Sequence, residues 1–276
     1  MGSIRLWTRE HALMNVPIPR GDELAFVRLY RLLENGMPLV LSDGKECLYV
    51  QEERSAPAWI WTANDISDER LQELLEVLCA QREQGYLASV IVKNRLARLL
   101  QLVFPDELAP RQQIEIYRMR VLVPHTAAGK DVRGKSVSAE DAGALIGLFT
   151  NEDGSAISTA EARHMGEVFV ESETSHAWLT PDGTLAAIAK RADVGARYSD
   201  VHTVITRPDL RRNGFASALL SVLCEAILAE GRTPMLYAEA ENDAATSVYR
   251  SLGFEPKARL SRLTFAVPGK FHKSLL

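Results

Sequence analysis

The sequence lacks the features that mark membrane proteins, secreted disulfide-rich proteins and zinc proteins. Its apolar runs all fall short of the roughly 20 residues that a membrane span needs. The opening residues MGSIRLWTRE carry charges too early for a secretory signal. Three scattered cysteines, Cys47, Cys79 and Cys224, form neither a disulfide framework nor a metal-ligand spacing, and the six histidines form no H-E-x-x-H motif. We therefore expect a cytoplasmic protein without a metal site.

The chain also lacks an excess of positive charge. Its 32 lysines and arginines stand against 36 aspartates and glutamates, which gives a net charge of −4 at pH 7. This balance argues against a general nucleic-acid binder and is compatible with small cationic substrates. We expect no membrane partner, since no apolar run is long enough to span a bilayer. The oligomeric state stays open, a homodimer included.

A length of 276 residues favours two domains. Residues 1–123 alternate helical and extended patterns, which predicts a smaller α+β domain. We expect helices over residues 21–36, 67–85 and 94–104, and extended segments over residues 38–51, 58–62, 87–93 and 113–123. In the second of these helices, Ser67 suits the N-cap and Gly85 a left-handed stop. Trp59 and Trp61 lie on one face of a strand, which core packing explains better than an inter-domain surface or a wall of an acceptor site.

Residues 124–136 have no apolar periodicity, and we predict a linker there. The segment from Gly129 to Ser136 satisfies the G-x-x-x-x-G-K-[ST] pattern of a nucleotide-binding P-loop. A working P-loop needs its helix to begin at the lysine, here Lys135. Ser138 and Asp141 instead form the pattern of an N-cap, so the helix is expected to begin beyond Ser136. Nucleotide binding is therefore the less favoured interpretation.

The second predicted domain, residues 137–276, contains a strand followed by a basic turn and a long apolar helix. The β-branched strand DVHTVIT ends before Pro208, and helical spacing runs from near Gly214 to about Glu230. The free amides of the first helical turn, the helix dipole and the side chains of Arg211 and Arg212 together form a cradle for a diphosphate. A solvated basic turn is the alternative. A second strand, residues 233–242, then leads into a short helix that carries Tyr249.

These two strand-to-helix units resemble the GNAT superfamily of acyl-CoA-dependent N-acetyltransferases. Arg211, Gly214 and Ala216 match its [QR]-x-x-G-x-[GA] loop, and the segment AEAENDAATSVYRSLGFE matches its later block. The resemblance covers residues 137–276 and implies a mixed, mostly antiparallel central sheet that splays between its fourth and fifth strands. The first domain is compatible with a degenerate copy of the same fold, as in tandem members of the superfamily.

The resemblance also implies roles for individual residues. The pyrophosphate of acetyl-CoA would lie on the loop, and the pantetheine arm would pair like an extra strand with Val204 to Thr206. Asn242 would contact the pantetheine or a bound water. The residues so assigned to the cofactor are Val204, Ile205, Thr206, Arg211, Arg212, Asn213, Gly214, Phe215, Ala216 and Asn242. Tyr249 would protonate the leaving thiolate, and a backbone amide near Val204 would polarise the thioester carbonyl.

The identity of the general base stays open. Asp200 and Glu239 are the leading candidates, and Glu241 and His202 are alternatives on the same two strands. Glu171, Glu173 and His176 lie in the region where the family recognises its acceptor, although a charged loop explains them equally well.

We expect an N-acetyltransferase that moves an acetyl group directly from acetyl-CoA to a primary amine of a small molecule, peptide or protein. A non-catalytic acyl-CoA sensor is the alternative from a different class.

Overall fold

The computed structural model describes residues 3–53, 56–148 and 156–266. The chain forms two compact units. Unit 1 comprises Met1–Ile116, Glu239–Glu241 and Ala258–Leu276, and unit 2 comprises Tyr117–Ala238 and Asn242–Lys257. Among the described residues, no helix combines the length and the apolar character that crossing a membrane requires.

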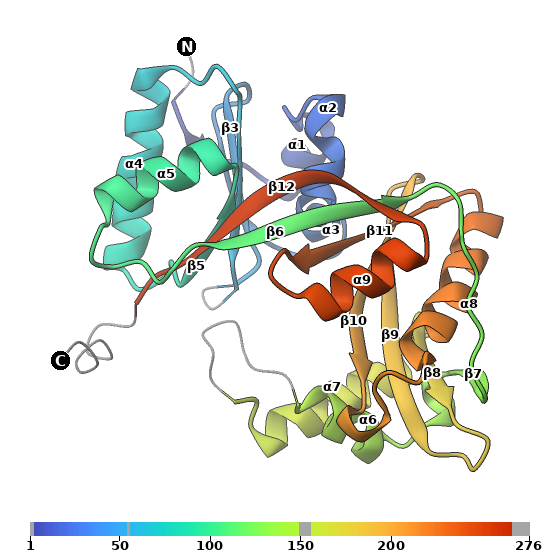
Figure 1. Ribbon diagram of the computed structural model, residues 1–276. Helices are drawn as coiled ribbons and strands as arrows, with labels where there is room; N and C mark the ends of the chain where they lie inside the picture. Colours follow the sequence, from blue (N-terminus) through green and yellow to red (C-terminus); the bar gives the residue numbers. More distant parts are fainter. Residues whose placement is uncertain (1–2, 54–55, 149–155, 267–276) are drawn as a thin grey trace. The chain divides into compact units, whose positions relative to one another are not determined.

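Unit 1 has the mixed α+β character that its sequence predicts (Figure 1). Its elements are β1 (Arg5–Leu6), α1 (Arg9–Met14), α2 (Arg20–Glu23), α3 (Val27–Asn35), β2 (Leu39–Ser42), β3 (Cys47–Gln51), β4 (Ala58–Thr62), α4 (Asp68–Glu83), β5 (Ser89–Val92), α5 (Asn94–Val103) and the first part of β6 (Gln112–Met119). Strands β1 to β4 pair antiparallel in chain order, whereas β4 and β5 are parallel because α4 connects them.

Two local predictions in unit 1 have different outcomes. The boundaries of α4 are confirmed, since the Ser67 side chain accepts a hydrogen bond from the Arg70 amide and Gly85 has a φ of 73°. The single helix expected over residues 21–36 is wrong. It is divided into α2, a 3-10 turn (Leu24–Phe26) and α3, because Phe26, which is completely buried, leaves helical geometry at φ −119° and ψ 23°.

Trp59 and Trp61 are both buried in unit 1, as core packing predicts. The indole nitrogen of Trp61 donates to the Asp22 carboxylate at 2.8 Å, and the Lys93 ammonium lies 5.5 Å from the centre of a Trp61 ring. This hydrogen bond satisfies the polar atom of a buried indole.

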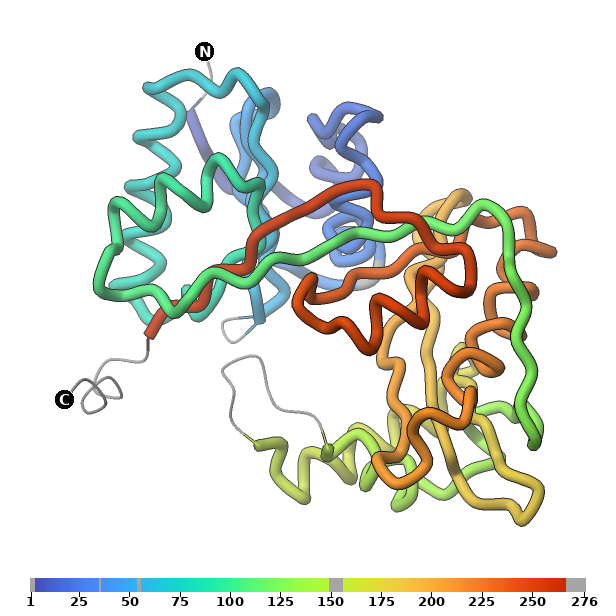
Figure 2. Tube along the Cα trace, in the orientation of Figure 1, coloured from blue at the N-terminus to red at the C-terminus, as the bar shows by residue number. Residues whose placement is uncertain are grey.

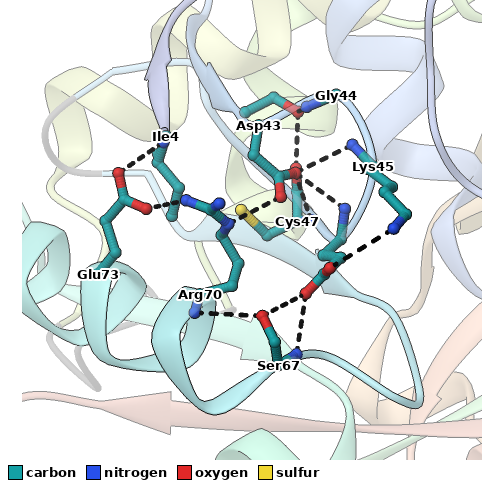
Figure 3. A network of polar contacts seen from close by, with 10 residues as sticks. Ile4, Asp43, Gly44, Lys45, Cys47, Ser67, Arg70 and Glu73 are labelled. Carbon is teal, nitrogen blue, oxygen red and sulfur yellow. Dashed lines mark hydrogen bonds and ion pairs between the residues drawn. The ribbon is translucent and has the colours of Figure 1, made fainter. Parts of the chain in front are cut away.

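A network of charged side chains ties the turn between β2 and β3 to α4 (Figure 3). Asp43 accepts hydrogen bonds from the backbone amides of Lys45, Glu46 and Cys47, and its other oxygen pairs with Arg70 at 2.9 Å. Arg70 also pairs with Glu73, which in turn accepts from the amide of Ile4 at 2.6 Å. The network therefore attaches the start of the chain to the first turns of α4.

Unit 2 contains the segment that resembles the GNAT fold. Its elements are the end of β6, β7 (Lys130–Arg133), α6 (Ala139–Ile146), α7 (Thr159–Glu171), β8 (Ser175–Leu179), β9 (Leu185–Val194), β10 (Tyr198–Thr206), α8 (Phe215–Ala229), β11 (Thr233–Glu239), α9 (Asp243–Ser251) and the beginning of β12 (Phe254–Thr264). The strand order is β6-β11-β10-β9-β8-β7, antiparallel from β7 to β10 and parallel between β10 and β11. The predicted mixed, mostly antiparallel sheet is confirmed.

Two cores lie on opposite faces of this sheet, as the alternation of side chains along β9 requires. Ile188 packs with residues of α6 and α7, whereas its neighbours Ala187 and Ala189 pack with residues of α8 and α9. The sheet of unit 2 is therefore covered by α6 and α7 on one face and by α8 and α9 on the other.

The stretch predicted as a linker forms ordered structure in unit 2. Residues 130–133 are strand β7, and the amide of His125 donates to the Ser221 hydroxyl of α8 at 2.8 Å. The P-loop pattern ends in a 3-10 turn, and α6 begins only at Ala139 behind the Ser138 cap, as predicted. Lys135 pairs with Glu173 at 3.1 Å and both side chains are largely exposed. The helix geometry of a P-loop is therefore missing at Lys135.

Two strands pass from one unit into the other. Strand β6 leaves unit 1 after Ile116, and β12 leaves unit 2 after Lys257. Within unit 1, the end of β12 pairs antiparallel with β5, from Ser261 opposite Val92 to Thr264 opposite Ser89. Figure 2 shows this returning segment in red at the end of the described chain. Unit 1 is thus completed by the last strand of the sequence.

Candidate functional site

The pairing of β10 with β11 ends early, which opens the sheet of unit 2. The parallel pairs run from Tyr198 opposite Thr233 to Asp200 opposite Met235 and go no further, whereas β10 stays paired with β9 as far as Thr206. The β11-facing edge of residues 204–206 consequently lacks a strand partner in the described structure. This is the splay that the resemblance implies between the fourth and fifth strands.

A β-bulge lies at the beginning of this opening. His202 pairs with Lys190 and Ile205 with Ile188, so Thr203 and Val204 stand opposite a single residue of β9. Thr203 has a φ of 54°, a left-handed conformation that a β-branched residue rarely adopts. A bulge changes the direction of the local backbone groups and concentrates near functional sites. Sequence reasoning missed Thr203, because a β-branched residue in a strand gives no signal of left-handed backbone.

Helix α8 begins beside the open strand end with an uncapped first turn. Gly214 is its N-cap residue, with a φ of 79° and no side-chain hydrogen bond to the following amides. A methyl group placed on Gly214 would have Ala127 as its nearest neighbour at 3.8 Å, so space exists there and the backbone conformation demands the glycine. The N-cap residue therefore offers no side-chain acceptor to the amides of Phe215 and Ala216, which suits an anion site.

The basic turn before α8 is held by its own hydrogen bonds. The Asn213 side chain donates to the carbonyls of Leu210 and Arg211 at 3.1 and 3.2 Å, and Arg211 Nε donates to the Thr206 carbonyl at 3.3 Å. Arg212 has a φ of 64° and is exposed, as are Arg211 and Asn213. Both predicted arginines therefore lie in the turn between β10 and α8, and the turn is preorganised by Asn213.

One hydrophobic core holds these parts together. Phe215 and Tyr249 are buried members of a single cluster, and Val204 and Leu210 pack against it. Because the side chain of Phe215 is in this core, only its backbone amide can serve a ligand. The predicted loop, strand end and tyrosine thus come together through packing, although they are far apart in sequence.

Tyr249 lies on α9 with 9% of its surface exposed. Its ring packs against Tyr117 of β6, at 6.1 Å between ring centres, and against Phe254 of β12, at 6.0 Å. Asn242 is the N-cap of α9, and its side chain accepts from the Ala245 amide at 3.1 Å. That hydrogen bond uses the Asn242 carbonyl oxygen and leaves the amide group for other contacts.

The candidate bases occupy different surroundings. Asp200 is completely buried in β10, and His202 is half-buried, with Nδ1 at 2.9 Å from the Thr203 hydroxyl. Glu239 and Glu241 are exposed in the short segment that belongs to unit 1. Among the described residues, no group of three or more His, Cys, Asp and Glu side chains could hold a metal ion.

The charged residues considered for acceptor recognition do not form one cluster. Glu171 and Glu173 are exposed, whereas His176 is buried on β8. The His176 ring contacts the Asp131 carboxylate through Nδ1 at 3.2 Å and the Arg133 guanidinium through Nε2. These contacts explain His176 as a residue that joins β7 to β8.

A family model matches part of the sequence. Residues 183–263 match the family model described as FR47-like protein. None of the curated proteins matches the sequence significantly.

Several solved structures share the fold along nearly the whole chain. A protein from Drosophila has a TM-score of 0.66 at 12% identity, with 96% of this chain and 99% of that chain covered. A GCN5-related N-acetyltransferase from Sphaerobacter thermophilus has a TM-score of 0.64 at 15% identity, with 94% of each chain covered. A tandem GNAT protein from the clavulanic acid biosynthesis pathway has a TM-score of 0.59 at 11% identity, with 97% and 99% covered. The chain therefore matches the FR47-like family model over residues 183–263 and shares its fold with these solved GNAT structures.

Proposed function

We propose that the protein is an acetyl-CoA-dependent N-acetyltransferase that acts on a primary amine. The observation that carries the proposal is the uncapped, glycine-started N-terminus of α8 beside the unpaired end of β10. A helix N-terminus attracts phosphate, and an open strand edge accepts an extended amide chain. Acetyl-CoA carries both groups, a diphosphate and an amide-containing arm.

The residues of this site suit the two parts of the cofactor. The pyrophosphate would be held by the amides of residues 213–216 together with the charges of Arg211 and Arg212. The pantetheine arm would pair with the free edge of residues 204–206, and Asn242 would offer its side-chain amide. Gly214 leaves the approach open, since its nearest neighbour for an added methyl group is 3.8 Å away.

Protein groups would carry out three steps of the reaction. The bound cofactor supplies an acetyl thioester that an amine can attack. An alkylammonium has a pKa near ~10 and is not nucleophilic, so Asp200 or Glu239 would remove one proton, through water where the carboxylate does not reach the amine. The backbone amide near Val204, in the bulge of β10, would donate to the thioester oxygen as negative charge develops there. The phenol of Tyr249 would give its proton to the departing sulfur.

The partner and the location are proposals of the same kind. The acceptor is a small-molecule amine or an amino group of a peptide or protein, with neither nucleic acid nor membrane as a partner and with a homodimer as an option. All three cysteines are free, and burial raises the pKa of Cys47 and of Cys224 to about 12. Free thiols suit the reducing cytoplasm, where we place the protein.

One observation favours a sensor that binds acyl-CoA without turnover. Asp200 is completely buried, whereas a base must reach the amine or a water beside it. A sensor needs the cradle alone and would not depend on the proton of Tyr249.

Transfer to a panel of amines, followed by thiol release and by the mass of the product, decides between the two functions. The wild type should acetylate at least one amine. Tyr249→Phe should lower kcat by roughly 100-fold, the lower end of the range for loss of a general acid, and should leave the affinity for acetyl-CoA unchanged. Tyr198→Phe at the start of β10 is the matched control and should retain full activity. Binding of acetyl-CoA without transfer to any amine would contradict the catalytic proposal.

A further inference from the structure

A second tyrosine contacts the ring of Tyr249, and an arginine contacts that second tyrosine. Tyr117 of β6 is completely buried, and its ring lies 6.1 Å from that of Tyr249 at an interplanar angle of 57°. Arg250, the next residue of α9, donates from Nη2 to the Tyr117 hydroxyl at 3.1 Å. Its guanidinium also lies 5.9 Å from the centre of the Tyr117 ring.

These contacts fix α9 against the sheet at the position of Tyr249. The hydrogen bond joins Arg250 of α9 to Tyr117 of β6. It therefore attaches the helix to the strand one residue after Tyr249, whose phenol must point at the leaving sulfur. Phe254 also contacts the Tyr249 ring, at 6.0 Å between ring centres and an interplanar angle of 71°. The Tyr249 ring therefore contacts two aromatic rings, and one of these is anchored by a charge-assisted hydrogen bond.

We propose that Tyr117 and Arg250 are positioning residues for Tyr249. This inference rests on the proposed function, in which Tyr249 transfers its phenolic proton to the sulfur that leaves the acetyl group. Proton transfer depends steeply on distance and angle, so a displacement of about 1 Å can lower a rate 100-fold. The anchored Tyr117 ring keeps α9 and the Tyr249 phenol in one place. Neither Tyr117 nor Arg250 needs to touch the substrate.

The structure also explains why position 117 is tyrosine. A phenylalanine would preserve the ring contact with Tyr249 but would remove the oxygen that accepts from Arg250. Tyr117→Phe therefore keeps the ring and removes the oxygen that accepts from Arg250, and Arg250→Met removes the donor of the same hydrogen bond. Both substitutions preserve the approximate size of the side chain, so the fold should survive them.

The first test observes Tyr249 directly and needs no acetyl-CoA. In protein with ring-labelled tyrosine, the NMR signal that Tyr249→Phe eliminates belongs to Tyr249. Tyr117→Phe and Arg250→Met should each shift or broaden this signal, whereas Tyr198→Phe should leave it unchanged. An unmoved Tyr249 signal in both variants would overturn the inference.

The second test asks whether the effect on turnover passes through Tyr249. Tyr117→Phe and Arg250→Met should each lower kcat about tenfold, the usual size for a lost hydrogen bond to a charged group, without changing KM for acetyl-CoA. In a Tyr249→Phe background, neither should lower kcat further. Equal losses in both backgrounds, or wild-type kcat in the single variants, would overturn the positioning role.

The outcomes separate this inference from the proposed function. If the wild type transfers acetyl groups and Tyr249→Phe is slow while Tyr117→Phe is normal, the positioning role alone fails. If the wild type transfers nothing to any amine, the proposed function fails and the role in turnover with it.

Discussion

Asp200 of β10 lies opposite Met235 of β11 in the last pair that joins these two parallel strands. Beyond this pair β10 bulges at Thr203 and continues beside β9 alone, and the turn that follows leads to Gly214 at the start of α8. The end of strand pairing and the uncapped helix are thus consecutive features of one strand-to-helix unit. Together these two features form the proposed cofactor site.

Substitution of Gly214 by glutamate should abolish binding of acetyl-CoA. The new carboxylate would lie at the first amides of α8 and repel the pyrophosphate, and a left-handed φ of 79° would cost about 1 to 2 kcal/mol of stability for a side chain. Titration calorimetry gives the affinity. Gly183→Glu is the matched control, because Gly183 has a φ of 87° and open space around it but lies in the turn between β8 and β9. Equal loss of binding in both variants would show that strain, and not the cradle, is responsible.

Replacement of Gly253 by alanine should destabilise the protein strongly. Gly253 has a φ of 96°, and an added methyl carbon would lie only 2.2 Å from the Val121 carbonyl oxygen. Backbone strain and overpacking together should lower the free energy of unfolding by about 2 to 4 kcal/mol. Urea denaturation measures the loss. Gly231→Ala has a similar φ of 74° and no neighbour within 4 Å, so it should cost about half as much, and an equal cost would contradict the steric argument.

Helices α4 and α8 each connect two parallel strands, but their N-termini differ. Each follows one strand of a parallel pair and precedes the other. At the start of α4, Glu46 accepts hydrogen bonds from the amide and the hydroxyl of Ser67, both at 2.8 Å, and Ser67 caps the helix. The N-terminus of α4 thus has a carboxylate of its own, whereas that of α8 has no side-chain cap. We therefore expect acetyl-CoA at α8 and not at α4.

The carboxylate at α4 should make the stability of unit 1 sensitive to acid. The hydrogen bonds from the Ser67 amide and hydroxyl hold the pKa of Glu46 below its ordinary value. Because the folded pKa is lowered, the contribution is complete above the unfolded value of about 4.3 and is lost as the pH falls below it. Glu46→Gln should therefore lose less stability than the wild type between pH 5 and pH 3, in urea denaturations at each pH. Parallel curves for the two proteins would contradict this role.

Removal of residues 258–276 should unfold unit 1 although the deletion is at the opposite end of the sequence. The segment 261–264 pairs with β5, and Leu263 and Phe265 are buried in the core of unit 1. Loss of either side chain alone typically costs about 2 to 5 kcal/mol. Hydrogen exchange of peptides from β4 and β5 measures the effect, and deletion of residues 267–276 alone is the control. Protected β4 and β5 peptides in the longer deletion would show that unit 1 does not need β12.

Local signals predicted much of this structure, and non-local ones were missed. The caps at Ser67 and Ser138 and the left-handed glycines Gly85 and Gly231 mark helix ends in the sequence, because each acts within a few residues. The break at Phe26 lies within a continuous helical pattern of the sequence, and no local residue marks it. The return of β12 to unit 1 depends on pairing between residues more than 150 positions apart, and no short motif encodes it.

The candidate site likewise has parts that the sequence predicts and parts that it does not. The loop around Gly214 is visible in sequence because glycine at a helix start has a backbone reason. The bulge at Thr203 and the anchor between Arg250 and Tyr117 are not visible, since they depend on strand register and on a distant strand. Motifs therefore indicated the proposed cofactor site, and the structure was needed to show the contacts of Tyr249.

The most direct test of the account is calorimetric titration of the protein with acetyl-CoA and, separately, with Mg-ATP. We predict that acetyl-CoA binds with a stoichiometry of one per chain, that Gly214→Glu abolishes this binding, and that Mg-ATP does not bind. Binding of Mg-ATP alone, or acetyl-CoA binding that survives Gly214→Glu, would contradict the assignment of the N-terminus of α8 as the acyl-CoA site.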